Sequence, residues 1–360
     1  MAGQGHLGIE TTHALACPFL VKMLRYLPCR RLVSQCLEEG VWKSPWARAL
    51  GHAWAHLAEP ERPADWPLDV RVVGVGGAVL GGSYKTPLVL ALARALAVRG
   101  PLHVLASAYS ASTSGVLQVQ PSAPTSQVGD EAAWLSRELD PLKVAVMVGS
   151  NRTQVVGLLA SAGCWVLVDG LLQTRPRRLH RSLLVLDARR PWGSGRCPPA
   201  GDLRARPDRL LRASDAVVLV EDDAVRPEFH SPLGGLPCFW ARSELRGAIA
   251  PDGRCVSFEA MRQPRLGLIL AIARPNRILR ALARHHVVPS VVHLQADHTE
   301  PSRGLRAEPV DAWLTSGKCA TKLGRRLGKA PVWVLDHRLT LEPNLVEFVA
   351  EGQNRASVRH

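Results

Sequence analysis

The chain has 360 residues, enough for one large domain or two smaller ones. Its hydrophobic fraction of 46% and charged fraction of 21% are ordinary for a folded protein and exclude disorder throughout the chain. The net charge of +14 favours anionic partners such as phosphorylated substrates, anionic lipid or nucleic acid. An Arg-rich solvated surface without any such partner explains the charge equally well.

The cysteines contain no Cys-x-x-Cys pair, so zinc-type spacing is absent. Cys164 is expected to be a buried thiol, and a reducing, cytoplasmic compartment fits this cysteine usage best. No apolar run reaches the roughly 18 residues of a membrane-spanning helix, and the N-terminus lacks a signal-peptide pattern. Because an aromatic content of 5% provides few stacking platforms, no nucleic acid partner is expected.

Residues 1–68 are predicted to form a helical N-terminal segment that ends in a Pro-rich connector. Within it, residues 18–27 place an apolar stripe on one helical face, with Lys22 and Arg25 elsewhere. The stripe consists of Phe19, Leu20, Met23, Leu24 and Leu27. Such a basic amphipathic helix can lie in a membrane interface, or it can pack on its own domain.

Residues 69–225 alternate between strand and helix patterns and open with a β-branched run at 71–75. Closely spaced glycines follow this run, and a helical pattern then occupies residues 88–99. Pro87 suits the first turn of that helix. Strand, glycine-rich turn and helix together predict the opening of a βαβ unit.

The remaining elements are predicted from apolar runs and helical spacing. Strands are expected at 102–106, 143–148, 164–168, 183–187, 215–220, 266–272, 291–294, 312–315 and 331–335. Helices are expected at 130–139, 151–162, 207–213, 275–286, 318–327 and 342–351. The sequence therefore predicts an α/β, P-loop NTPase-like fold with a mostly parallel sheet flanked by helices. A second, smaller α/β lobe covers residues 226–352, and the tail at 353–360 is expected to be frayed.

The glycine-rich turn has the composition of a phosphate-binding loop. Its residues are Gly81, Gly82, Ser83, Tyr84, Lys85 and Thr86. Glycines let consecutive backbone amides face one anion, and the helix that follows directs its positive end at the same point. Lys85 can then reach the β- and γ-phosphates of ATP, and the Thr86 hydroxyl can bind Mg²⁺. The alternative is a glycine-rich turn that binds no nucleotide.

Short motifs follow the loop in a fixed order over residues 70–325. They are Gly81-Gly82-Ser83-Tyr84-Lys85-Thr86-Pro87, Val128-Gly129-Asp130-Glu131, Val148-Gly149-Ser150-Asn151-Arg152, Asp169-Gly170-Leu171-Leu172-Gln173-Thr174, Pro199-Ala200-Gly201-Asp202-Leu203-Arg204, Ala273-Arg274-Pro275, Asp297-His298 and Thr315-Ser316-Gly317-Lys318. In this order they resemble the motifs of the tetraacyldisaccharide 4'-kinases, the lipid A 4'-kinases of Gram-negative envelope synthesis.

The resemblance implies that ATP phosphorylates the 4'-hydroxyl of a tetraacyldisaccharide 1-phosphate at the cytoplasmic face of the inner membrane. The partners are then the lipid disaccharide and an anionic membrane surface that the protein contacts peripherally. Carried over, Asp130 is the general base, His298 is its partner and Lys85 completes the catalytic set. Taken alone, Asp130 could instead be a helix N-cap, and His298 could be a surface histidine.

The candidate ligands of Mg²⁺ are Thr86, Glu131 and Asp169. Asp169 follows a predicted strand, at the edge where α/β sheets bind their ligands.

The chain departs from the family's motifs at Tyr84, Gly170, Thr174, Gly317 and Cys319. Tyr84 replaces the loop glycine that often takes a positive φ, a conformation that costs another residue about 1–3 kcal/mol. These departures leave two hypotheses, a divergent working kinase or a relative that binds nucleotide or anionic lipid without turnover.

Overall fold

The computed structural model describes residues 30–107, 115–149, 151–159, 163–222, 233–299, 305 and 308–351. The predicted stripe at 18–27 and the tail at 353–360 lie outside these residues. In the part of the chain that is described, no helix has both the length and the apolar character to cross a bilayer.

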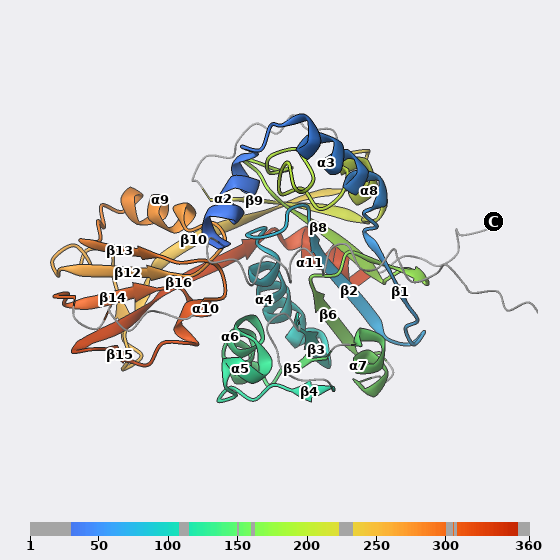
Figure 1. Ribbon diagram of the computed structural model, residues 1–360. Helices are drawn as coiled ribbons and strands as arrows, with labels where there is room; N and C mark the ends of the chain where they lie inside the picture. The colour runs from blue at the N-terminus through green and yellow to red at the C-terminus, as the bar shows by residue number, and fades with distance from the viewer. Residues whose placement is uncertain are drawn as a thin grey trace, which may run out of the picture.

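One continuous sheet organises the molecule, with strand order β13-β12-β14-β16-β10-β9-β8-β2-β6-β3-β5-β4. All neighbours on this path are parallel except β10 with β16 and β4 with β5. We call the part built on β2, β3, β5, β6, β8 and β9 the first lobe, and the part built on β12, β13 and β14 the second lobe. Figure 1 shows the second lobe at the left end and α4 near the centre of the whole molecule.

The first lobe contains the strands and helices up to β9. Its strands are β1 (Glu61–Ala64), β2 (Arg71–Gly77), β3 (Leu102–Leu105), β4 (Leu117–Gln118), β5 (Ala145–Val148), β6 (Trp165–Asp169), β7 (Gln173–Pro176), β8 (Arg181–Asp187) and β9 (Ala216–Glu221). Its helices are α2 (Arg30–Glu39), α3 (Pro45–Leu57), α4 (Lys85–Leu96), α5 (Thr125–Val128), α6 (Asp130–Leu139), α7 (Arg152–Leu159) and α8 (Pro207–Arg212), with short 3₁₀ turns η1 (Ala97–Arg99) and η2 (Asp140–Leu142).

Helices cover both faces of the first lobe's sheet, because alternate residues of each buried strand point to opposite sides. Val73 and Val75 of β2 pack with α4, α6 and α11 (Pro343–Glu351). Val72 of the same strand packs with α7 on the other face, and Leu184 of β8 packs with α3 and α8. The first lobe is therefore a three-layer sandwich whose sheet carries ligand-binding loops at the carboxyl ends of its strands.

Two long strands, β10 (Cys238–Ile249) and β16 (Ala330–Leu341), connect the lobes. Each has 12 residues, and their antiparallel pairing shifts register between Leu245 and Ala248. One end of β10 pairs with β9 of the first lobe, while one end of β16 pairs with β14 of the second. This ribbon makes the sheet continuous from one lobe to the other.

The second lobe places α9 against its parallel strands. Its elements are β11 (Cys255–Val256), β12 (Leu266–Leu270), α9 (Asn276–Arg284), β13 (Val291–Leu294), β14 (Ala312–Thr315), α10 (Gly317–Ala320) and β15 (Arg326–Leu327). Ile278 and Leu282 of α9 are buried against Leu268 and Leu314 of the strands. The first residues of α9 and the whole of α10 lie at the carboxyl ends of β12 and β14, on the side that faces the phosphate loop.

Three sequence predictions about the elements are corrected by the structure. Residues 61–64, predicted to be part of the Pro-rich connector, form β1 and pair with β7. The helix predicted at 318–327 is only the short α10, because residues 326–327 pair with the start of β16. Residues 238–249, given no element, form the long strand β10, whose alternation of buried and exposed positions breaks at the register shift between Leu245 and Ala248.

Candidate active site

The phosphate loop connects β2 to α4, as the sequence predicts. Among the described residues, no acceptor receives a hydrogen bond from the backbone amides of residues 82–86. Gly82 takes φ +63°, which turns the chain toward the helix. Free amides at a glycine turn beside a helix N-terminus are the donors that a phosphate group requires.

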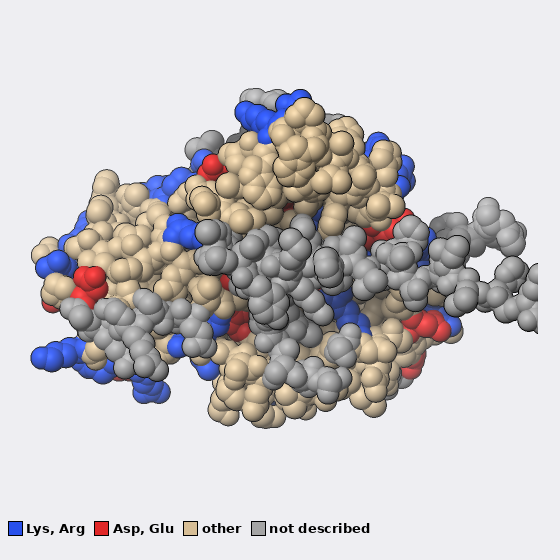
Figure 2. Space-filling view, viewed as in Figure 1, with Lys and Arg blue, Asp and Glu red and all other residues tan. Residues whose placement is uncertain are grey.

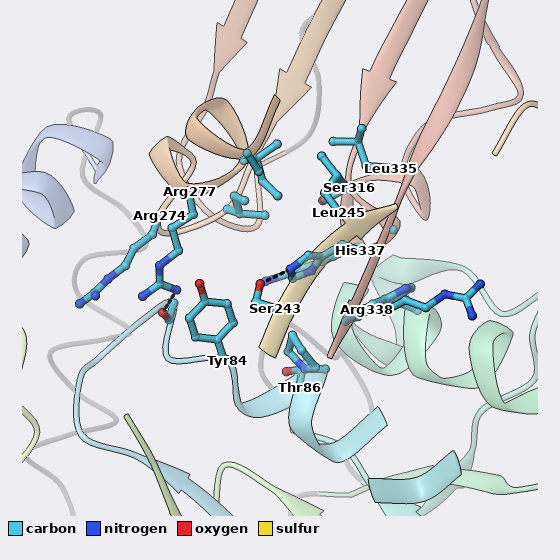
Figure 3. A pocket seen from close by; sticks show the side chains of 18 of the residues that line it. Tyr84, Thr86, Ser243, Leu245, Arg274, Arg277, Ser316, Leu335, His337 and Arg338 are labelled. Atoms are coloured by element: carbon cyan, nitrogen blue, oxygen red, sulfur yellow. Dashed lines mark hydrogen bonds between the residues drawn. The ribbon is translucent and has the colours of Figure 1, made fainter. Parts of the chain in front are cut away.

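Tyr84 adopts φ +59° and ψ 13° and is the N-cap residue of α4. The chain therefore keeps the left-handed conformation at this position without a glycine. The Tyr84 side chain is 8% exposed and lies under the guanidinium of Arg277. The central carbon of this guanidinium is 4.1 Å from the centroid of the Tyr84 ring. In Figure 3 the ring extends toward Arg277 and Ser243, on a different side of the chain from Thr86.

Lys85 and Thr86 point toward the end of β6 and the start of α6. Lys85 Nζ donates to Ser83 Oγ at 2.9 Å, and Thr86 Oγ1 donates to Asp169 Oδ2 at 2.6 Å. Burial and the positive charge of Arg204 lower the pKa of Lys85 to about 8. Burial and the negative charge of Glu131 raise the pKa of Asp169 to about 6. This corner holds two carboxylates whose mutual repulsion a cation would relieve.

Asp130 and His298 form a hydrogen-bonded pair, although they are 168 positions apart in the sequence. The distance from His298 Nδ1 to Asp130 Oδ1 is 2.7 Å, and both side chains are buried. Gly129, not Asp130, is the N-cap residue of α6, and Asp130 gives that helix no side-chain cap. His298 has φ +67°, a strained conformation of the kind found at functional sites. The alternatives of a helix cap and a surface histidine are thus both excluded.

Two lysines that follow β14 complete the cluster around Asp130. Lys322 Nζ lies 2.9 Å from Asp130 Oδ2, and Lys318 Nζ lies 2.8 Å from Asp297 Oδ1 and 3.3 Å from Glu131 Oε1. Burial alone would raise the pKa of Asp130, but the hydrogen bond from His298 and the lysine charges hold that pKa well below its usual range. The carboxylate of Asp130 is therefore ionised at neutral pH.

The sequence motifs include Lys318 but did not predict that either Lys318 or Lys322 lies at the site. The two lysines are four residues apart directly after a buried strand, and that spacing is the one signal that could have identified them.

Two cavities meet at Lys85. The first, of about 260 Å³, lies between the phosphate loop and the second lobe, and Glu131, Asp297 and Lys318 are among its lining residues. The second, of about 410 Å³, is mainly apolar and is lined by α3, Gly77 and Gly170. A group bound in either cavity can therefore approach the Lys85 ammonium.

The two departures after β6 have structural explanations. Gly170 takes φ +76°, a conformation in which an aspartate would be strained. Thr174 accepts a hydrogen bond from Trp66 Nε1 at 2.9 Å and donates one to the carbonyl of Arg177 at 2.7 Å. Both residues fit their local backbone.

The two departures in α10 are also accommodated by packing. A Cβ atom at Gly317 would lie 2.4 Å from Trp134 Nε1, so no larger residue fits beside this ring. Cys319 is buried, and its Sγ accepts a hydrogen bond from the amide of Ala271 at 3.2 Å. None of these departures removes a member of the Asp130–His298 cluster.

Comparison with known proteins gives a consistent result. A profile of the tetraacyldisaccharide-1-P 4'-kinase family matches residues 50–353. A tetraacyldisaccharide 4'-kinase of Geobacter sulfurreducens is 33% identical over 304 residues, covering 78% of this chain and 83% of the relative. One of Chromobacterium violaceum is 32% identical over 294 residues, covering 78% and 84%.

The crystal structure of "apo" form LpxK from Aquifex aeolicus in complex with ATP has the same fold. Its TM-score is 0.60 at 21% identity, and the match covers 89% of this chain and 99% of that chain. The span of the family profile and the identity to the curated relatives show that this chain belongs to the tetraacyldisaccharide-1-P 4'-kinase family.

Proposed function

We propose that this chain transfers the γ-phosphate of ATP to the 4'-hydroxyl of a tetraacyldisaccharide 1-phosphate. The observation that carries the proposal is the Asp130–His298 pair, whose nitrogen and oxygen atoms lie 2.7 Å apart. The residues next to each of them in the sequence, Glu131 and Asp297, line the same cavity as the phosphate loop. A sugar hydroxyl becomes a competent nucleophile only when a nearby group accepts its proton. Family membership and the ATP-binding relative support the nucleotide.

The transfer makes one bond and breaks one. The 4'-oxygen bonds to the γ-phosphorus as the bridge to the β-phosphate breaks, and ADP leaves with the electron pair of that bridge. The hydroxyl proton passes to the Asp130–His298 unit. Because Asp130 is held ionised by its neighbours, the proton rests on the imidazole and the carboxylate stabilises the resulting charge.

The cations of the site have distinct roles in the proposal. Lys85 and the free amides of the loop hold the β- and γ-phosphates and neutralise the charge that develops on them. Lys318 holds Glu131 and Asp297 in place from the second lobe.

The residues present fit Mg²⁺. Thr86 and Asp169 are already in contact at 2.6 Å, and Glu131 lies close enough to raise the pKa of Asp169. The described residues contain no group of at least three His, Cys, Asp or Glu side chains arranged for a metal. Mg²⁺ commonly binds through one or two carboxylates and completes its shell with phosphate oxygens and water. When bound, the ion would neutralise charge on the transferring phosphate.

The second cavity is the proposed entry of the acyl chains. It is bordered by Leu50, Leu57 and Trp54 of α3 and reaches Lys85 at its inner end. Leu50 and Leu57 are themselves exposed, and so are Leu32 of α2 at 60% and Trp46 of α3 at 61%. Figure 2 shows uncharged surface over α3 with basic side chains beside it. This combination suits peripheral contact with anionic lipid on the cytoplasmic face of the inner membrane.

The proposal is tested by incubating the purified protein with labelled ATP, Mg²⁺ and tetraacyldisaccharide 1-phosphate. We expect phosphorylated lipid from the wild type. Lys85→Ala should lose at least about 100-fold of that activity, because it removes a charge from the phosphate site. Lys329→Ala, an exposed lysine on the turn before β16, is the matched control and should be as active as the wild type.

Absence of phosphorylated lipid at every protein concentration would contradict the proposal. ATP binding measured by calorimetry without any turnover would instead support a relative that binds but does not catalyse.

A further inference from the structure

Tyr84 is the residue by which this chain differs most from an ordinary phosphate loop, and the structure places it at a junction between the lobes. It keeps φ +59° although its Cβ makes that conformation unfavourable. A non-glycine residue persists in this region of conformational space when its surroundings hold it there. The contacts of its ring show which surroundings do so.

The ring of Tyr84 packs against Arg277, which belongs to α9 of the second lobe. The Arg277 guanidinium lies 4.1 Å from the ring centroid, within the range of a cation–π contact. The same guanidinium donates to the carbonyl of Gly82 and pairs with Asp187 at the end of β8. One arginine thus contacts the loop at two points and the first lobe's sheet at a third.

Arg274, one turn earlier, reinforces this junction. Its Nη2 lies 3.0 Å from Asp202 Oδ2 and its Nη1 lies 3.5 Å from Asp187 Oδ2. A Cβ atom placed on Gly82 would lie 2.8 Å from Arg274 Cγ, so this side chain lies directly on the loop. Figure 3 shows Arg274 and Arg277 above the loop, with Tyr84 between Arg277 and Ser243.

We propose that Tyr84 is a positioning residue that fixes Arg277, and through it the second lobe, against the phosphate loop. The inference rests on the proposed kinase function, because the loop and the second lobe both line the first cavity, in which the ATP of that proposal would bind. A planar guanidinium that stacks on an aromatic ring loses orientational freedom. The bonds from Arg277 to Gly82 and Asp187 are therefore held in one geometry. Tyr84 therefore contributes to nucleotide binding and does not impair it.

This role predicts a change in ATP affinity opposite to the change expected if Tyr84 impairs the loop. If Tyr84 merely replaces a better glycine, Tyr84→Gly should strengthen ATP binding. If Tyr84 positions Arg277, Tyr84→Gly relieves backbone strain yet weakens ATP binding, and Tyr84→Phe retains it because the ring remains.

The test measures the Kd of a non-hydrolysable ATP analogue by calorimetry, KM and kcat for ATP, and the melting temperature. We expect Tyr84→Gly to raise Kd and KM about 5- to 20-fold, a typical range for a cation–π contact in a partly desolvated site. Tyr84→Phe should remain within about 2-fold of wild type. In a double-mutant cycle with Arg277→Ala, the two effects should add up to less than their sum, because each substitution removes the contact between the ring and the guanidinium.

Unchanged or improved Kd and KM in a folded Tyr84→Gly protein would overturn the inference, as would additive effects in the cycle. A lowered melting temperature with unchanged Kd and KM would mean that Tyr84 is only structural, and would overturn it as well. Lys85→Ala separates this result from failure of the proposed function. If the wild type binds ATP and Lys85→Ala does not, the phosphate site stands whatever Tyr84→Gly does.

Discussion

At the scale of single residues, the site combines groups whose charges are set by their neighbours. Asp130 is kept ionised by His298 and by the lysines after β14, whereas Asp169 is driven toward neutrality by burial and Glu131. Carboxylates whose environments push their pKa values apart are suited to different tasks. In the proposed mechanism, Asp130 accordingly stabilises the charged imidazole of His298, and Asp169 helps to bind the metal.

His337 provides a pH prediction at this scale. Its Nε2 lies 2.7 Å from Ser243 Oγ, and burial, followed by the charge of Arg277, lowers the pKa of His337 to about 4. Below the unfolded-state pKa of about 6.5, the unfolded chain binds a proton that the folded protein does not. The stability that this neutral imidazole contributes is therefore present above pH ~6.5 and is lost as the pH falls toward ~4.

We expect the wild type to lose up to about 3 kcal/mol from this residue between these pH values. His337→Gln should lose correspondingly less, because glutamine has no proton to gain. Denaturant unfolding of both proteins at pH 7 and pH 4.5 measures the difference. Equal pH dependence of the two proteins would contradict a neutral, partly buried His337.

At the scale of elements, the sequence predicted best where periodicity and local chemistry agree. Residues 130–139 form α6 as predicted, since an apolar helical pattern follows the Gly129 turn. β10 was missed because the polar run from Arg242 to Glu244 interrupts the apolar pattern of residues 238–249, and their strand pairing comes from β9 and β16. Long-range partners of this kind leave no local signal.

In the candidate site too, local features could be predicted from the sequence and long-range contacts could not. The phosphate loop could be predicted from residues 81–86 alone, because its chemistry is local. The pairing of Asp130 with His298 could come only from the family resemblance, since these residues are brought together by the packing of two lobes. The cavity at Lys85 and the contact of Tyr84 with Arg277 had no signal in the sequence.

Gly317 supplies a prediction for α10. Gly317→Glu would restore the acidic residue of the family, but its Cβ would meet Trp134 Nε1 at 2.4 Å. Overpacking of this kind typically costs about 1–3 kcal/mol. We expect a lower melting temperature for Gly317→Glu and an unchanged one for Gly324→Glu, which lies in an exposed position after the same helix. A Gly317→Glu protein as stable as wild type would show that Trp134 can move aside.

At the scale of the whole molecule, net charge and exposed apolar residues together suggest how the protein meets its lipid substrate. The charge of +14 attracts an anionic surface, and the exposed side chains of α2 and α3 can enter it. Of these two helices, α3 also lines the second cavity. A lipid could therefore pass from the bilayer surface toward Lys85 without crossing the nucleotide cavity.

Flotation with phosphatidylglycerol vesicles tests this arrangement. Leu32→Ser combined with Trp46→Ser should reduce the bound fraction about tenfold or more, since each buried apolar side chain contributes about 1.5–3 kcal/mol. Val98→Ser, which changes a residue of η1 that is 85% exposed, is the control and should float like wild type. Equal flotation of all three proteins would contradict membrane contact through α2 and α3.

A single-turnover assay of Asp130→Asn, paired with calorimetry of ATP binding, bears most directly on the kinase assignment. We expect phosphoryl transfer to slow by at least about 100-fold, because the imidazole that takes the proton loses the carboxylate that stabilises its charge, while the Kd for ATP changes less than about 3-fold. Asp140→Asn, an exposed aspartate just after α6, should match the wild type in both measurements. A wild-type rate for Asp130→Asn would show that the Asp130–His298 pair does not take the proton.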